Sequence, residues 1–179
     1  VSTLVASCEK DLICPTLKSG QSYFVGAETC KKCHSQAYEV WQNAVYKKEG
    51  KDEKGNSIIR QVGHSKAWQA LTNANKSKDR SCVGCHSVGF MKPGGYCKVA
   101  EVGNKINVQC ESCHGAGSLH AQAGDPKLIR KRVTESICRE CHHVPHIQTH
   151  DSFVYDKELL KILGKGHGEA LLKKLSHQR

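Results

Sequence analysis

The sequence predicts a mainly α-helical chain with much irregular coil, and three observations point to this fold class. Apolar residues recur at helical spacing in several short stretches, of which residues 35–45 are the clearest. No run of alternating apolar and polar residues stands out as a strand. The third observation is a pentapeptide, Cys-x-x-Cys-His, that occurs four times in 179 residues.

The four pentapeptides begin at residues 30, 82, 110 and 138. Two thiols at this spacing form thioethers to the vinyl groups of a haem, and the next histidine binds the iron from the proximal side. A zinc site needs no histidine after every second cysteine, and a redox disulfide motif would stand alone beside a βαβ unit. The pattern therefore predicts four haem c groups. The expected thioether cysteines are Cys30, Cys33, Cys82, Cys85, Cys110, Cys113, Cys138 and Cys141, and the expected proximal iron ligands are His34, His86, His114 and His142.

The composition suits a chain wrapped around its cofactors. Hydrophobic residues make up only 38% of the sequence, which would leave a thin core for a plain polypeptide. Four large apolar porphyrins would themselves become the core. We therefore expect one small multihaem domain over residues 23–179, preceded by an N-terminal segment of residues 1–22.

The elements follow in order along the chain. The sequence predicts a helix at 35–45, a charged and glycine-punctuated loop at 47–56, and a second helix from His64 onward. A tight turn is expected at 89–96, around Pro93-Gly94-Gly95. Two amphipathic stretches, 157–163 and 167–175, end the chain.

The charge is strongly positive, with a formal net charge of +10. Haem propionates are anionic at neutral pH and would offset much of this excess, so we expect redox partner proteins and no nucleic acid. No stretch of 18 or more apolar residues is present, so no transmembrane segment is expected. Because haem c is attached outside the cytoplasm, a periplasmic or extracellular protein with its signal peptide removed is expected.

Seven histidines remain for the distal side of the irons once the four proximal ones are assigned. Met91 is the only methionine, so bis-histidine ligation must dominate, and this lowers the reduction potential relative to His/Met ligation. Met91 itself is interpreted as a core filler.

The sequence resembles the tetrahaem cytochrome c-554 family over about residues 23–175. The resemblance rests on Phe24-Val25-Gly26, Trp41, Gly94-Gly95-Tyr96 and Cys110 to Gly115, followed by His120. It implies that His120 ligates the first haem, His64 the third and His167 the fourth. In that family the second haem has an open distal face.

This chain departs from the family by the charged loop before His64 and by the cluster of His143, His146 and His150. His146 is the first choice, and His150 the second, to close the second haem; the alternative is that the cluster contacts propionates or solvent. His143 and His177 are expected not to be ligands.

The C-terminal block, from Pro145-His146 to Gly166-His167-Gly168, is also similar to tetrahaem cytochromes that form extracellular filaments, in which a histidine of one subunit ligates a haem of the next. A second copy of the chain is therefore a candidate partner.

Three cysteines, Cys8, Cys14 and Cys97, lie outside the haem motifs. In an oxidising compartment they predict one disulfide and one further thiol. Cys8–Cys14 is favoured because it closes a short loop, and pairing of Cys97 with either of them is the alternative.

The sequence thus favours a low-potential electron-transfer protein, not an enzyme, with no catalytic residues assigned. The competing hypothesis is a reductase of small nitrogen species at an open second haem. All four motifs end in histidine, whereas dedicated multihaem nitrite reductases replace the catalytic one by lysine, so the enzyme hypothesis is the weaker.

Overall fold

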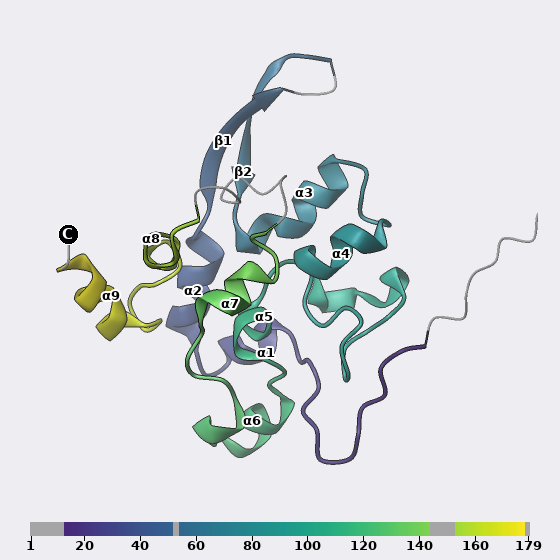
Figure 1. Cartoon of the computed structure of the whole chain (residues 1–179), viewed down its shortest axis with the longest axis vertical. Helices are drawn as coiled ribbons and strands as arrows, with labels where there is room; N and C mark the ends of the chain where they lie inside the picture. Colours follow the sequence, from purple (N-terminus) through teal and green to yellow (C-terminus); the bar gives the residue numbers. More distant parts are fainter. Residues whose placement is uncertain (1–12, 52–53, 144–152, 178–179) are drawn as a thin grey trace, which may run out of the picture.

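The computed structural model describes residues 13–51, 54–143 and 153–177. Short helices joined by long irregular segments surround the centre of the molecule, and one β-hairpin projects from it (Figure 1). The α-helices are α1 Ala27–Lys31, α2 Ser35–Asn43, α3 Ala67–Asn73, α4 Arg80–His86, α5 Cys110–His114, α6 Ser118–Ala123, α7 Glu135–Arg139, α8 Tyr155–Leu160 and α9 Glu169–Ser176. The 3₁₀ turns are η1 His64–Lys66, η2 Val99–Glu101, η3 Gly103–Lys105 and η4 Pro126–Leu128, and the strands are β1 Tyr46–Lys51 and β2 Ser57–Val62. The predicted fold class, mainly α with much coil, is confirmed.

Each haem motif lies wholly or partly on a helix of five to seven residues. Helices α4 and α5 contain their whole motifs, whereas α1 and α7 end inside theirs. In the latter two the histidine N–H closes a helical turn on the first cysteine, with His34 N 2.9 Å from Cys30 O and His142 N 2.9 Å from Cys138 O. Residues four apart share a helix face, so the first thiol and the iron-binding ring are directed to the same side.

The predicted helix at 35–45 is confirmed as α2. It buries Tyr38, and the indole Nε1 of Trp41 donates to the carbonyl oxygen of Val108 at 2.7 Å. The helix that follows His64 is confirmed as η1 and α3. Val108 N donates to His64 O at 3.1 Å, so both segments pack next to the loop that leads into α5.

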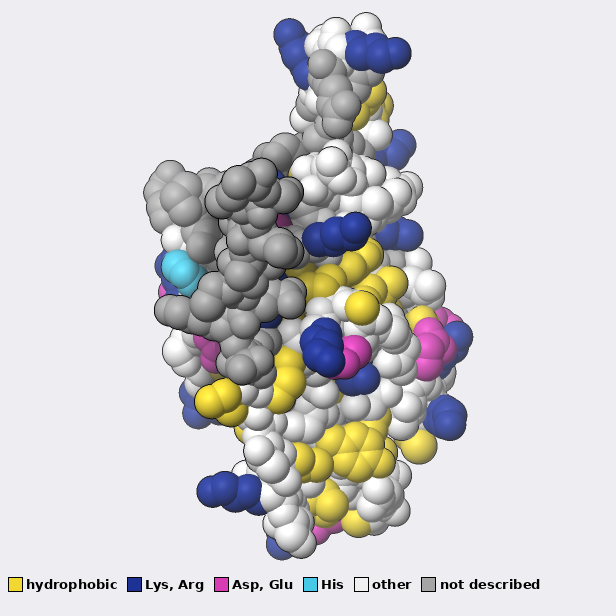
Figure 2. All heavy atoms as spheres, turned by 90° about the vertical axis from the view of Figure 1, so that its right-hand side faces the viewer, with side chains coloured by type: hydrophobic (Ala, Val, Ile, Leu, Met, Phe, Trp, Pro, Cys, Tyr) yellow, Lys and Arg dark blue, Asp and Glu magenta, His cyan; other side chains and the backbone are white. Residues whose placement is uncertain are grey.

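The expectation of no strands is wrong for residues 46–62. Strands β1 and β2 pair antiparallel in a register that runs from Tyr46 opposite Val62 to Lys51 opposite Ser57. β1 is mostly polar and charged, so it lacks the apolar alternation that identifies strands in a sequence. The hairpin leaves the body of the molecule, and Lys and Arg side chains gather at its tip (Figure 2). Ile59, 66% exposed, lies on β2.

The side-chain core is small and lies beside the second motif. Leu71, Val83 and Tyr96 are buried together, and Trp68, Phe90 and other apolar residues pack around them. The turn at 89–96 is confirmed: Met91 N donates to Tyr96 O and Gly95 N to Lys92 O. Val83 sits inside the second motif, so this core supports one haem site directly.

The N-terminal segment is joined to this core by a disulfide between Cys14 and Cys97. The preference for Cys8–Cys14 is therefore wrong, because the fold brings residue 14 next to the 89–97 turn, a contact that sequence distance cannot reveal. Ser22 Oγ and Tyr23 N each contact Ser118 Oγ, which lays this segment along α6. The division into residues 1–22 and 23–179 stays a prediction.

Helices α8 and α9 lie at one side of the molecule and correspond to the two amphipathic stretches expected at the end of the chain (Figure 1). Within the described ranges, no helix has the length and apolar character needed to cross a bilayer.

Candidate haem-binding centres

Three of the four motif histidines face a second histidine ring across a gap. The ring centroids are 6.0 to 6.3 Å apart in each pair. The pairs are His34 with His120, His142 with His64, and His114 with His167.

This spacing fits a metal ion between the two rings. A metal–imidazole bond is about 2 Å long, and two such bonds on opposite sides of one ion place the ring centres about 6 Å apart. The donor set, two imidazoles with a Cys-x-x-Cys pair beside one of them, is that of a bis-histidine haem c.

Main-chain carbonyls orient several of these rings. The Nδ1 atoms of His114, His120 and His167 lie 2.7, 2.9 and 2.6 Å from the carbonyl oxygens of Arg130, Asp125 and Ile162. His86 has the same arrangement, with Nδ1 2.6 Å from Ala67 O. A carbonyl oxygen only accepts, so Nδ1 carries the proton and the Nε2 lone pair is left for the metal.

Burial also favours the neutral imidazole, the form that binds a metal. Desolvation lowers the pKa of His64 to about 4, with the neighbouring His142 adding to the effect. Desolvation likewise lowers the pKa of His114 and of His142.

The structure corrects two of the implied pairings. His120 faces His34, as expected for the first site. His64, however, faces the histidine of the fourth motif and not that of the third, while His167 faces the third and not the fourth. The reason lies in the tertiary structure. The Gly164–His167 turn packs on α2, and this brings His167 to the histidine of the third motif. Turn η1 lies beside the fourth motif.

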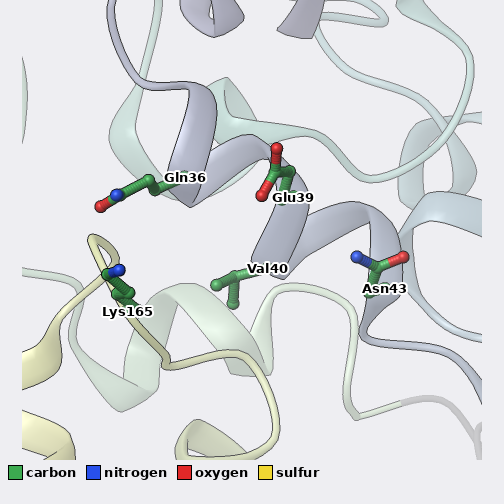
Figure 3. Close-up of a pocket in the computed structure, with 5 residues that line it drawn as sticks. All are labelled: Gln36, Glu39, Val40, Asn43 and Lys165. Atoms are coloured by element: carbon green, nitrogen blue, oxygen red, sulfur yellow. The ribbon is translucent and has the colours of Figure 1, made fainter.

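A close-packed glycine turn presents His167. Gly164 N and His167 N each donate to the other residue's carbonyl at 2.9 Å. A Cβ on Gly164 would lie 2.8 Å from Val40 Cγ2, so only glycine fits against α2 at this position. An open pocket lies between α2 and this turn, with Gln36, Glu39, Val40 and Asn43 on the helix and Lys165 across from them (Figure 3).

Thiol contacts reveal which motifs are neighbours. The Cys30 thiol lies next to that of Cys110, which raises the pKa of Cys30. The Cys141 thiol lies next to that of Cys85, which raises the pKa of Cys141. Cys138 lies close enough to Cys113 to raise its pKa, after the larger effect of burial. The attachment sites therefore follow the spatial order one, three, four, two, which sequence order does not predict.

The two remaining histidines proposed for the second site, His146 and His150, lie outside the described residues. Met91 is a neighbour of Arg80, whose Nη2 lies 3.5 Å from the methionine sulfur. His143 is exposed, and its Nδ1 contacts Arg139 O at 2.7 Å.

Sequence reasoning missed two polar residues at the third motif, Gln109 and Glu111. Both are buried, and both bond to main-chain groups at the start of α1. A charged residue between the two cysteines reads as a solvated surface residue, so no sequence signal identified it.

Comparison with known proteins points to the cytochrome c-554 family. The family model described as cytochrome c554 and c-prime matches residues 29–115. Cytochrome c-554 of Nitrosomonas europaea is 34% identical over 107 residues, which cover 57% of this chain and 44% of that protein. The chain is similar to the cytochrome c-554 family over this part of its length. The resemblance inferred from the motifs is thereby confirmed, and so is the prediction of four haem c groups.

The fold of this chain is also similar to that of a solved cytochrome c554. The solved structure of cytochrome c554 from Nitrosomonas europaea in its reduced state matches with a TM-score of 0.53 and 21% identity, over 77% of this chain and 82% of the other. The chain spans less than half the length of the curated cytochrome c-554 that it matches.

Proposed function

We propose that this chain is a low-potential electron carrier of the periplasm or cell exterior, in which electrons pass among four haem c groups. The observation that carries the proposal is the set of three histidine ring pairs at 6.0 to 6.3 Å. When bound, the haems supply the one-electron chemistry. The protein's residues fix, orient and shield them.

In this proposal the eight motif cysteines form the thioethers and the four motif histidines are the proximal ligands. His120, His64 and His167 are the distal ligands at the first, fourth and third sites, and His146 is proposed for the second. Carbonyl oxygens hold the rings so that Nε2 faces the metal. Two strongly donating imidazoles on each iron favour the ferric state and so a low potential.

The spatial order of the motifs supports a linear route. The first and second motifs lie at the two ends, and the third and fourth lie between them, as the thiol contacts indicate. Electrons would then enter near one end of the series and leave near the other. The Cys14–Cys97 disulfide supports the proposed oxidising compartment.

Replacement of the distal histidines tests the assignment. His64→Ala should convert one low-spin iron in four to high spin and raise its potential. His177→Ala, at the exposed histidine that follows the last residue of α9, is the matched control. An unchanged low-spin spectrum in His64→Ala would reject the ligation proposed here.

Carbon monoxide binding distinguishes the electron-carrier hypothesis from the reductase hypothesis. A carrier with four bis-histidine irons should bind carbon monoxide slowly and at no single site preferentially. Rapid binding to one iron in four of the reduced protein would favour an open catalytic site at the second motif.

We further propose that copies of the chain join into a filament through an inter-subunit haem ligand from the His143–His150 cluster. The similarity of the C-terminal block to filament-forming cytochromes supports this, and contacts that do not close on themselves generate helical polymers. Negative-stain microscopy of native material should show filaments; a monodisperse monomer with four low-spin haems would reject the polymer and leave electron transfer intact.

A further inference from the structure

The third motif contains a buried carboxylate that is held only by main-chain groups. Glu111 is 2% exposed. Its Oε1 accepts from Val25 N at 3.0 Å and Gly117 N at 2.8 Å, and its Oε2 accepts from Gly26 N at 2.8 Å and Val25 N at 3.1 Å. Both oxygens accept from N–H donors, which is the bonding pattern of an ionised carboxylate.

The donors belong to the entry of the first motif. Residues 25 and 26 lead directly into α1, and Gly26 has φ +84°, in the left-handed region that glycine favours. This conformation lets two successive N–H groups converge on one anion. A Cβ at residue 26 would meet the tip of the Asn104 side chain at 2.7 Å, so the positive φ is the stronger reason for glycine at this position.

Gln109, two residues before Glu111, makes a second bond to the same segment. Its Oε1 accepts from Ala27 N at 2.6 Å, and its Nε2 donates to the carbonyl oxygens of Asn104 and Ile106 at 2.6 and 2.7 Å. Helix α1 has no side-chain cap of its own. Residues at the third motif therefore cap the helix that carries the first motif, and α1 and α5 lie in contact beside this bond.

The charge at this position distinguishes the third motif from the others. The residue after the first cysteine is Lys31, Val83, Glu111 and Arg139 in the four motifs, so only the third places an anion there. Among the described residues no ion pair involves Glu111. A buried charge of this kind acts on its surroundings with little screening. A nearby anion stabilises the more positive ferric iron relative to the ferrous iron.

We propose that Glu111 is a positioning residue for electron transfer: it holds the first and third attachment sites side by side and keeps the potentials of their two haems low. This inference rests on the proposed electron-transfer function. Glu111 contacts the main chain of both sites, whereas the second and fourth motifs lie further along the series of thiol contacts.

The test is a potentiometric titration of the holoprotein followed by NMR of the haem methyl signals, which separates the four haems. Glu111→Gln keeps the side-chain shape and removes the charge. We expect it to raise the potentials of the haems at the first and third motifs and to leave the other two unchanged. Glu140→Gln is the matched control, since Glu140 lies in the fourth motif, is 59% exposed and pairs with Lys92 at 3.6 Å.

Glu111→Asp tests the effect of the charge apart from that of side-chain length, since it keeps the carboxylate on a shorter side chain. It should retain low potentials at both sites even if Glu111→Gln fails to mature. The proposal would be overturned if Glu111→Gln left all four potentials at their wild-type values. It would also be overturned if Glu111→Asp raised the potentials of the first and third haems as much as Glu111→Gln does. Both of these results, in a protein with four reducible haems, would leave the proposed electron-transfer function intact. That function would be rejected only if the wild-type holoprotein did not exchange electrons with mediators.

Discussion

The second and third motifs solve the same packing problem by opposite means. Each buries the residue that follows its first cysteine: Val83 in the second and Glu111 in the third. Val83 lies in an apolar cluster with Leu71 and Tyr96. Glu111 instead collects main-chain N–H groups from a segment 85 residues away. The apolar site is held by non-directional packing, whereas the polar site is held by directional bonds that fix one helix against another.

The two residues between the cysteines of a haem motif can therefore support the fold either by apolar packing or by hydrogen bonding. Hydrophobic packing anchors the end of the series near the disulfide, and hydrogen bonding sets the spacing of the first and third sites. We expect mutations to separate the two kinds of support, beginning with the change that should remove both.

The largest effect should follow from blocking haem attachment. Both regions are small, and few hydrophobic side chains are buried among the described residues, so neither region is expected to fold without the porphyrins. A chain produced without haem maturation should show no cooperative unfolding transition by circular dichroism. A cooperative transition in that material would mean that the two protein-built regions suffice.

Leu71→Ala should weaken the apolar region next most strongly. Leu71 is 4% exposed, and the loss of its side chain opens a cavity beside Val83 that costs about 2–5 kcal/mol of unfolding free energy. Chemical denaturation of the holoprotein measures this. Leu171→Ala, at a residue 40% exposed on α9, is the control and should change little.

Much of this arrangement was predictable from the sequence, and the part that was not is long-range. The motifs identified the cofactors and the family, and helical periodicity located α2 and α3. The partners of His64 and His167 were exchanged because each lies far in sequence from the motif it faces, so no local pattern fixes the pairing.

The hairpin and the polar contacts could not be predicted from the sequence for other reasons. Strand β1 is built from charged residues that indicate a loop, and its pairing with β2 is a tertiary effect. The role of Gln109 depends on where the start of α1 lies. Cys14 pairs with Cys97 across 83 residues, and spacing cannot specify such a bond.

Gln109→Ala should weaken the polar region by a smaller amount than Leu71→Ala weakens the apolar one. It leaves the N–H of Ala27 and two carbonyl oxygens without this partner, which we expect to cost about 1–3 kcal/mol. The same denaturation experiment applies, with the exposed Gln122→Ala on α6 as control. A loss no larger than that of the control would remove Gln109 from the account.

The smallest effect concerns pH and the bond between Tyr38 and Glu28. The Tyr38 hydroxyl donates to the Glu28 carboxylate, and this bond, aided by desolvation, raises the pKa of Tyr38 to about 12 from its usual 10.0. Because the folded pKa exceeds the unfolded one, this contribution is complete below pH 10 and is lost as the pH rises from 10 to 12.

Tyr38→Phe should therefore flatten the loss of stability between pH 10 and 12, measured by thermal unfolding. Tyr23→Phe, at a tyrosine 44% exposed, is the control and should follow the wild type. Identical alkaline profiles for Tyr38→Phe and the wild type would contradict a role for the Tyr38–Glu28 bond.

The central claim is that three histidine pairs enclose three of the four irons, and an experimental density map of the holoprotein tests it most directly. The account predicts His120 on the iron of the first motif, His167 on that of the third and His64 on that of the fourth, each bound through Nε2. A map with His64 on the iron of the third motif, or with any of these three irons lacking its distal histidine, would contradict it.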